Sequence, residues 1–208
     1  MNVRVRVVDY GLGNLRSVSK GLERAGADVE ITDSPAEIDE AEAVVLPGVG
    51  AFREGMEELE RLRGAVEDAA DDTPILGICL GMQMLLTESE EGSESGAVEG
   101  LDLIPGRVVR FPDGVGKIPH MGWNSLSIER QHPVVSGVED GSYVYFVHSY
   151  YADAGSGSTV ASTEYGVEFS SVVSNERGNV VGTQFHPEKS GEVGLGILKG
   201  FVEYSEEY

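Results

Sequence analysis

The chain has little cysteine and few basic residues. One of its 208 residues is cysteine, and 15 Lys and Arg stand against 36 Asp and Glu, which gives a formal net charge of -21 at pH 7. A single cysteine cannot form an internal disulfide, so Cys79 is either a small buried hydrophobe or a nucleophile. Because nucleic acids and anionic membranes attract basic patches, this charge argues against both as partners.

Long hydrophobic runs are also missing. No stretch of the sequence approaches the roughly 18 consecutive apolar residues of a membrane span. The first residues lead directly into a strand-like segment and do not read as a signal peptide. We therefore expect a cytoplasmic protein with a solvated acidic surface, whose self-repulsion a high-salt environment would screen.

The sequence does contain enough apolar material for a core. Hydrophobic residues make up 40% of the chain and occur in short, bounded runs. Because α/β folds of about 200 residues are routine as one unit, we expect a single domain over residues 1–208.

Strand-like and helix-like segments alternate through the first half of the chain. Runs of β-branched residues predict strands, whereas apolar residues at helical spacing predict amphipathic helices. We expect strands at residues 3–9, 29–32, 43–46 and 74–79, and helices at residues 15–26, directly after Ser34, at 56–66 and at 81–87. This alternation predicts an α/β fold with an open, twisted, mostly parallel sheet and flanking helices.

The second half of the chain is rich in β-strand patterns. We expect strands at residues 107–111, 124–128, 143–148, 159–165 and 180–185, followed by a final helix at 192–204. Residues 119–124, Pro-His-Met-Gly-Trp-Asn, contain too much Gly and Pro for a plain strand. Residues 90–99, rich in Gly, Ser and Glu, form a candidate flexible loop.

Residues 77–81, Gly-Ile-Cys-Leu-Gly, fit the strand-turn-helix pattern of a nucleophile elbow centred on Cys79. The turn is so tight that side chains two residues on either side of the nucleophile would clash, which explains Gly77 and Gly81. Cys79 would then lie at a helix N-terminus, whose partial positive charge favours the reactive thiolate. The alternative is a buried cysteine between two glycines that serve packing alone.

His186 and Glu188 supply a base and its orienting partner. They follow the expected strand at residues 180–185, and Pro187 between them holds the segment extended. Residues two apart on an extended chain project to the same side, so His186 can accept the thiol proton while Glu188 orients its ring. A capped turn at a strand end is the alternative for His-Pro-Glu by itself, but the elbow favours a triad.

Residues 47–50, Pro-Gly-Val-Gly, close a strand that a doubly wound order can place beside the nucleophile strand. Glycines at 48 and 50 let the amides of Val49 and Gly50 turn towards an incoming oxyanion. The Leu80 amide at the helix start can be a second donor. An ordinary turn between a strand and a helix is the alternative.

These motifs, in this order, resemble the class I (triad) glutamine amidotransferases, which combine oxyanion-strand glycines, an elbow cysteine and His-Pro-Glu. The match covers the whole chain. Further segments look like the glutaminase subunits of imidazole glycerol phosphate synthases within this family, at residues 9–14, 47–52, 77–83, 119–124, 146–150 and 184–190. The resemblance implies one amidotransferase type 1 domain of flavodoxin-like α/β fold.

The resemblance implies hydrolysis of L-glutamine to glutamate and ammonia. Ammonia would pass through a tunnel to a (β/α)8-barrel cyclase, the partner in a heterodimer of histidine biosynthesis. The cyclase would combine it with its nucleotide substrate to form imidazole glycerol phosphate and an aminoimidazole carboxamide ribotide.

By motif position, the resemblance places glutamine against Gly50, Gln83, Glu91, Ser149 and Tyr150. Gln83 lies one helical turn beyond Cys79 on the same face, which supports its role from geometry. The family commonly has Thr at the position of Ser149, an exchange without consequence if the contact is made by the backbone.

We expect four residues to face the synthase partner around the ammonia exit: Asn14, Trp123, Tyr145 and Lys189. Trp123 is the only tryptophan of the chain, and Trp dominates many binding hot spots. A buried anchor in the core is the alternative for Trp123.

Cofactor and metal chemistry are less well supported. Gly11 and Gly13 resemble the start of a dinucleotide-binding fingerprint, but Arg16 stands where its third glycine belongs. The triad side chains could nominally bind zinc, yet no paired ligand spacing accompanies them. We therefore expect neither a cofactor nor a metal. His120 and His148 lack a carboxylate two residues away, so we interpret both as packing residues.

Two rival functions stay open at this point. The chain could be a glutaminase that serves another synthase, such as one for pyridoxal phosphate or guanylate, and the interface segments would discriminate it. It could also be a noncatalytic binding protein of the same fold, whose signature would be a broken triad or oxyanion strand. Neither motif is broken in this sequence.

Overall fold

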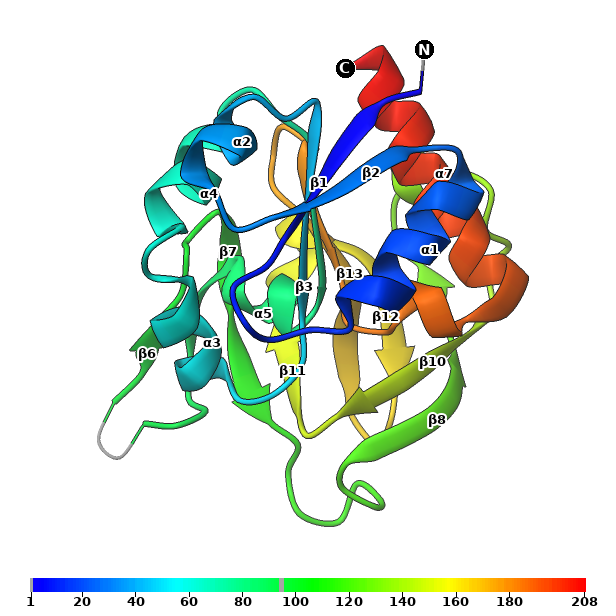
Figure 1. Ribbon diagram of the computed structural model, residues 1–208. Coiled ribbons are helices and arrows are strands. Elements are labelled where there is room, and N and C mark those ends of the chain that lie inside the picture. Colours follow the sequence, from blue (N-terminus) through cyan, green and yellow to red (C-terminus); the bar gives the residue numbers. More distant parts are fainter. Residues whose placement is uncertain (1, 94–95) are drawn as a thin grey trace.

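The computed structural model describes residues 2–93 and 96–208 (Figure 1). Its strands are β1 Arg4–Val8, β2 Asp28–Thr32, β3 Ala43–Gly48, β4 Ile75–Cys79, β5 Leu86–Ser89, β6 Val98–Glu99, β7 Ile104–Arg110, β8 His120–Ser125, β9 Ser127–Ile128, β10 Tyr143–His148, β11 Tyr150–Asp153, β12 Thr159–Glu164, β13 Glu168–Ser174 and β14 Val180–Thr183. Its helices are α1 Leu15–Ala25, α2 Pro35–Asp39, α3 Phe52–Leu59, α4 Arg63–Ala69, α5 Leu80–Met84, α6 Gly155–Ser158 and α7 Gly191–Glu207, with the 3-10 helices η1 Pro133–Val135 and η2 Pro187–Lys189.

A 12-stranded sheet forms the centre of the fold. Ten of its strands follow the order β2-β1-β3-β4-β14-β13-β11-β7-β5-β6, and off this path β12 pairs with β13 and β9 pairs with β12. The first five strands in this order, β2, β1, β3, β4 and β14, run parallel to one another. Antiparallel pairs join β14 to β13, β13 to β11 and β11 to β7, so the C-terminal half extends the sheet with mixed direction. The α/β class with a mostly parallel first half is thus confirmed.

The sheet carries one hydrophobic core on each face. Along β3 the side chains alternate, so that Val45 lies in one core whereas Val44 and Leu46 lie in the other. Helices α1 and α7 pack against each other over the first core, and α2 to α5 cover the second (Figure 1). Burial on both faces explains why these strands read as continuous apolar runs.

β8 and β10 form a separate antiparallel ribbon, at the lower right of Figure 1. Trp123 pairs with Tyr145, and His120 pairs with His148. The inward side chains of β10, among them Phe146 and His148, are buried, whereas Tyr143 is exposed. The expectation that residues 119–124 avoid a strand was therefore wrong: Gly122, at φ 136°, is accommodated within β8.

The helix expected across residues 56–66 is two helices. α3 ends at Leu59 and α4 begins at Arg63, and between them the Leu62 amide bonds the Leu59 carbonyl at 2.8 Å. This tighter turn still buries Met56, Leu59, Leu62 and Val66. The apolar spacing correctly predicted which side chains are buried, but it did not predict the turn between α3 and α4.

The helix expected over residues 81–87 is also shorter than its pattern suggested. α5 ends at Met84, and Leu86–Ser89 forms strand β5, which pairs in parallel with β7. Tertiary pairing overrides local propensity here. Strands β6, β11 and β13 were not expected. We expected a loop at residues 90–99, and β6 lies within that range. Two residues of that range, 94 and 95, lie outside the described residues.

In the described parts of the chain, no helix combines the length and apolar character needed to cross a membrane.

Candidate functional site

Cys79 occupies a sharp turn between a strand and a helix. It is the last residue of β4 and directly precedes α5, with φ 55° and ψ -107°. A β-carbon on Gly77 would lie 2.7 Å from the Met82 nitrogen, and one on Gly81 would overlap the Leu46 carbonyl oxygen. These contacts confirm that the turn requires glycine on both sides of Cys79.

The two strands beside β4 bring the other motifs to the same edge of the sheet. β3 lies on one side, with Gly48 opposite Cys79, and β14 lies on the other, with Thr183 opposite Ile78. Because the carboxyl ends of parallel strands meet at one edge, the chain after β3 and the chain after β14 both continue beside Cys79. The expected neighbourhood of the oxyanion and nucleophile strands is confirmed.

His186 and Glu188 are buried and hydrogen-bonded. His186 Nδ1 lies 2.9 Å from Glu188 Oε1, and the two side chains are 3% and 1% exposed. Since a carboxylate only accepts, Nδ1 carries a proton and Nε2 is the nitrogen left for other partners. Nε2 is buried and has no hydrogen-bond partner among the described residues.

Hydrogen bonds connect the backbone of His186 to β10, directly and through Ser190. Its amide donates to the Tyr145 carbonyl at 3.0 Å, and its carbonyl accepts from the Ser190 hydroxyl at 2.7 Å. The Ser190 hydroxyl in turn accepts from the Tyr145 amide at 2.9 Å. The ring of His186 is therefore held from the backbone as well as by Glu188.

Three effects act on the pKa of His186. Burial lowers it, but the Cys79 side chain and then the Glu188 carboxylate, both beside the ring, outweigh burial and raise the pKa to about 9. At neutral pH the ring is therefore an imidazolium, able to give a proton to a leaving group.

A cavity of about 330 Å³ opens beside Cys79. Its lining includes the residues expected as nucleophile, base, oxyanion donors and glutamine contacts, which are Val49, Gly50, Cys79, Leu80, Gln83, Glu91, Ser149, Tyr150 and His186. Pro119, Val147, His148 and Lys189 line it as well. Glu188 lies behind His186 and does not line it. The structure thus brings together every residue expected for catalysis and glutamine binding.

The oxyanion turn and Glu91 are both tied to neighbouring elements. The Tyr10 hydroxyl donates to the Pro47 carbonyl at 2.6 Å, directly before the turn, and Gly50 has φ 114°. Glu91 Oε2 accepts from the amide of Phe52, the first residue of α3, at 2.9 Å. Burial raises the pKa of Glu91, and this hydrogen bond opposes the rise. Glu91 thereby closes one side of the cavity.

The four expected interface residues are spread around the same edge. Asn14 is the exposed N-cap of α1, and Lys189 is exposed at the cavity. Trp123 is 55% exposed, and its ring centroid lies 6.0 Å from that of Tyr145. The alternative of a buried Trp123 was wrong, whereas a role in partner binding stays a prediction.

Gln184 was missed by the sequence analysis. It is fully buried, its Oε1 accepts from Gln83 Nε2 at 3.1 Å, and its Nε2 lies 3.9 Å from the Cys79 sulfur. The signal available was its place two residues before His186, since alternation along an extended segment puts both on one side. It connects the glutamine-binding candidate Gln83 with the nucleophile.

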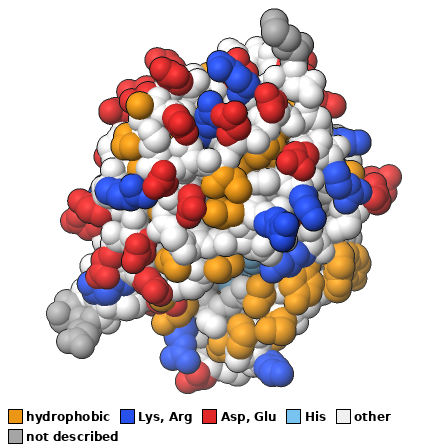
Figure 2. Space-filling model, viewed as in Figure 1, with side chains coloured by type: hydrophobic (Ala, Val, Ile, Leu, Met, Phe, Trp, Pro, Cys, Tyr) orange, Lys and Arg blue, Asp and Glu red, His pale blue; other side chains and the backbone are white. Residues whose placement is uncertain are grey.

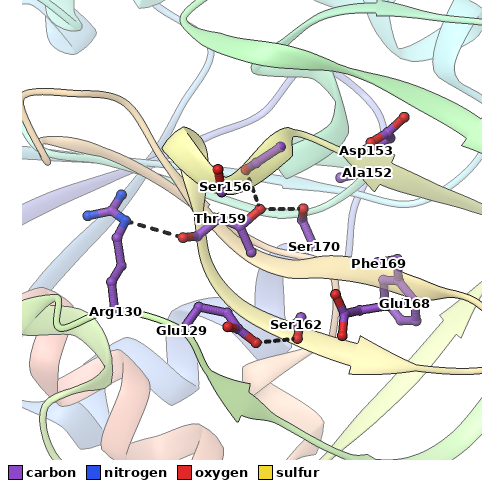
Figure 3. A pocket seen from close by; sticks show the side chains of 11 residues that line it. Glu129, Arg130, Ala152, Asp153, Ser156, Thr159, Ser162, Glu168, Phe169 and Ser170 are labelled. Atoms are coloured by element: carbon purple, nitrogen blue, oxygen red, sulfur yellow. Dashed lines mark hydrogen bonds between the residues drawn. The ribbon is translucent and has the colours of Figure 1, made fainter.

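A second cavity, of about 340 Å³, lies beside β11, β12 and β13 (Figure 3). Ser162 Oγ donates to Glu129 at 2.7 Å, and Arg130 Nε donates to the Thr159 carbonyl at 3.2 Å. Its lining offers hydroxyls, carboxylates and one guanidinium, but neither a thiol nor an imidazole. This second cavity therefore lacks the thiol and imidazole that line the cavity beside Cys79.

The raised pKa of His186 predicts a pH-dependent stability. Because the folded pKa, about 9, exceeds the unfolded value of about 6.5, this stabilisation is complete below about pH 6.5 and is lost as the pH rises through about 9. In that window the free energy of unfolding should fall by up to about 1.4 kcal/mol per pH unit relative to His186→Asn. Urea unfolding of both proteins across the window measures this, and parallel pH profiles would contradict a paired imidazolium.

Comparison with known proteins agrees with this geometry. The profile of the family "Glutamine amidotransferase class-I" matches residues 6–203. Among solved structures, a putative GMP synthase protein from Thermoplasma acidophilum has a TM-score of 0.75 at 22% identity and covers 100% of this chain and 96% of its own. PurLQS from Thermotoga maritima has a TM-score of 0.74 at 22% identity, covering 98% and 99%. These structures share the fold.

Curated relatives are much more similar in sequence. The imidazole glycerol phosphate synthase subunit HisH of Natronomonas pharaonis is 60% identical, covering 96% of this chain and 94% of the relative. The HisH subunit of Halobacterium salinarum is 61% identical, covering 95% and 92%. That of Methanosarcina acetivorans is 56% identical, covering 96% and 98%. The protein therefore belongs to the class I glutamine amidotransferases, in the branch formed by the HisH subunits of imidazole glycerol phosphate synthase.

Proposed function

We propose that this chain is the glutaminase subunit of an imidazole glycerol phosphate synthase, which hydrolyses L-glutamine and delivers the ammonia to a cyclase subunit. The observation that carries the proposal is the convergence of Cys79, the His186–Glu188 pair and the Val49–Gly50 turn on one cavity. The similarity to HisH subunits over nearly the whole chain supports the same activity. The chain works as one domain over residues 1–208.

Glutamine binds with its side-chain amide against Cys79. Gly50, Gln83, Glu91, Ser149 and Tyr150 line the cavity and hold the substrate. A cavity of about 330 Å³ suits a ligand of amino-acid size. No cofactor or metal takes part in the proposed reaction.

The first half of the reaction forms a covalent intermediate. The Cys79 thiolate attacks the amide carbon, and the amides of Val49, Gly50 and Leu80 stabilise the oxyanion of the tetrahedral intermediate. The His186 imidazolium donates its Nε2 proton to the departing nitrogen. The C–N bond breaks, ammonia leaves, and a γ-glutamyl thioester stays on Cys79.

The second half returns the enzyme to its starting state. His186, now neutral, takes a proton from water, and the resulting hydroxide attacks the thioester carbon at the same oxyanion site. The C–S bond breaks, glutamate leaves, and Cys79 is again a thiolate beside an imidazolium. Glu188 holds the ring in the same tautomer throughout, because Nδ1 donates to it in both halves.

The surface around the cavity suits a protein partner. Large side chains exposed on the β8–β10 ribbon are Met121 at 62%, Trp123 at 55% and Tyr143 at 59%. Figure 2 shows hydrophobic side chains gathered over this ribbon, with Lys and Arg side chains along the border of the patch. We assign this face, with Asn14, Tyr145 and Lys189, to the cyclase subunit. Lys189 both lines the cavity and is exposed, which supports an ammonia exit on this side.

Replacing the nucleophile separates ammonia production from ammonia use. With Cys79→Ala in the complex, glutamine-dependent synthesis of imidazole glycerol phosphate should fall to background, because no other thiol is present in the chain. Synthesis from added ammonium salt should stay within about twofold of wild type, since only the cyclase performs that step. Loss of the ammonia-dependent reaction with the complex intact would contradict the division of labour.

Replacing Trp123 tests the partner surface. Because truncation of a central Trp often removes about 2 kcal/mol or more, Trp123→Ala should weaken the affinity for the cyclase at least about 30-fold without unfolding the chain. Ile31→Ala is the matched control, since Ile31 is 48% exposed on β2, outside the ribbon. Calorimetric titration with the cyclase gives both affinities, and equal values for the two variants would remove Trp123 from the interface.

A further inference from the structure

A pair of buried histidines connects the β8–β10 ribbon to the glutamine cavity. His148 Nδ1 lies 2.8 Å from the Tyr150 carbonyl oxygen, and His148 Nε2 lies 3.0 Å from His120 Nδ1. His120 Nε2 lies 3.3 Å from Asn124 Nδ2. His120 and His148 are 3% and 6% exposed and pack among aromatic rings.

Only one arrangement of protons satisfies these contacts. A carbonyl oxygen only accepts, so His148 carries its proton on Nδ1, and in the neutral ring Nε2 is then an acceptor. His120 Nδ1 must therefore donate to it, which leaves His120 Nε2 to accept from Asn124. Burial lowers the pKa of His120 to about 4, and burial lowers the pKa of His148 to about 3 despite its hydrogen bond to Tyr150, so both rings are neutral at pH 7.

The Tyr150 carbonyl at the end of this chain of hydrogen bonds also holds Gln83. Gln83 Nε2 donates to it at 3.0 Å and to Gln184 Oε1 at 3.1 Å, so both of its N–H groups are used inside the protein. A flipped amide would place its oxygen against the Tyr150 oxygen. Gln83 Oε1, which has no hydrogen-bond partner among the described residues, is thereby left to accept an N–H group of a ligand in the cavity.

We propose that His120 and His148 are positioning residues for glutamine: they fix the Tyr150 carbonyl, which orients Gln83 as a hydrogen-bond acceptor for the substrate. This assignment rests on the proposed glutaminase function. Neither histidine takes part in the chemistry at Cys79. Their effect is on glutamine recognition, because a displaced Tyr150 carbonyl would hold the Gln83 amide less firmly with its oxygen towards the ligand.

The first experiment compares His148→Phe with His148→Asn in the complex with the cyclase. Phe removes the donor to Tyr150, whereas the Asn amide nitrogen can take the place of Nδ1. KM for glutamine should rise about tenfold in His148→Phe, the effect of about one lost hydrogen bond, with kcat within about twofold. His148→Asn should recover most of the loss. His132→Phe is the matched control, since His132 is a buried histidine that bonds the Gly178 carbonyl and not the cavity.

A double-mutant cycle tests whether His148 acts through Gln83. In a Gln83→Met background, which has no amide to orient, His148→Phe should cause no further rise in KM. Alkylation of Cys79 by iodoacetamide, which needs no glutamine site, should proceed at the wild-type rate in His148→Phe. If His148→Phe does not fold, His120→Phe removes the donor to His148 instead, with an expected rise in KM of about threefold, the effect of a partial loss of one hydrogen bond.

Three results would overturn the proposal: an unchanged KM in folded His148→Phe, an equal loss in His148→Asn, or additive losses with Gln83→Met. A failure of the glutaminase function is distinguishable, because it would appear as absent activity in the wild-type complex.

Discussion

The backbone conformation of Cys79 is the constraint on which the rest of the site depends. A non-glycine residue at φ 55° and ψ -107° is strained, at a cost of about 1 to 3 kcal/mol, and persists only where its surroundings enforce it. Here α5 packs so closely on β3 that a β-carbon on Gly81 would overlap the Leu46 carbonyl. The same approach leaves no room at Gly48, whose β-carbon would lie 2.8 Å from that of Leu80. The elbow and the oxyanion turn are thus two consequences of one close contact.

The buried histidines near the cavity illustrate how surroundings decide chemistry. His186 has the Glu188 carboxylate and the Cys79 thiol beside it, and its pKa rises to about 9. His148, buried among aromatic rings and facing a carbonyl, has its pKa lowered to about 3. The first ring can give and take a proton at the reacting atoms, whereas the second holds one tautomer and suits a positioning role. The difference follows from the groups beside each ring, since a backbone carbonyl carries no net charge with which to stabilise an imidazolium.

The sequence predicted the residues of the site more completely than it predicted the helices and strands around them. Cys79, His186 and the Val49–Gly50 turn were recognisable because each motif carries its own steric or chemical reason. Gln184 was not assigned a role, and His120 and His148 were interpreted as packing residues, because their hydrogen bonds join segments far apart in the chain.

In the fold, apolar spacing predicted burial better than it predicted boundaries. Met56 and Val66 are both buried as expected, yet a turn separates their helices. Leu86 begins a strand because β7 is available to pair with it, which no local pattern reveals. The β8 strand likewise tolerates Gly122 because β10 supplies the pairing.

The central claim is that Cys79 is the nucleophile of a glutamine site at the carboxyl edge of the sheet. The most direct measurement is mass spectrometry of the complex after treatment with a diazo ketone analogue of glutamine, with and without excess glutamine. The account predicts one adduct, on the peptide that contains Cys79, formed more slowly when glutamine is present. An adduct on another residue, or one whose formation glutamine does not slow, would contradict it.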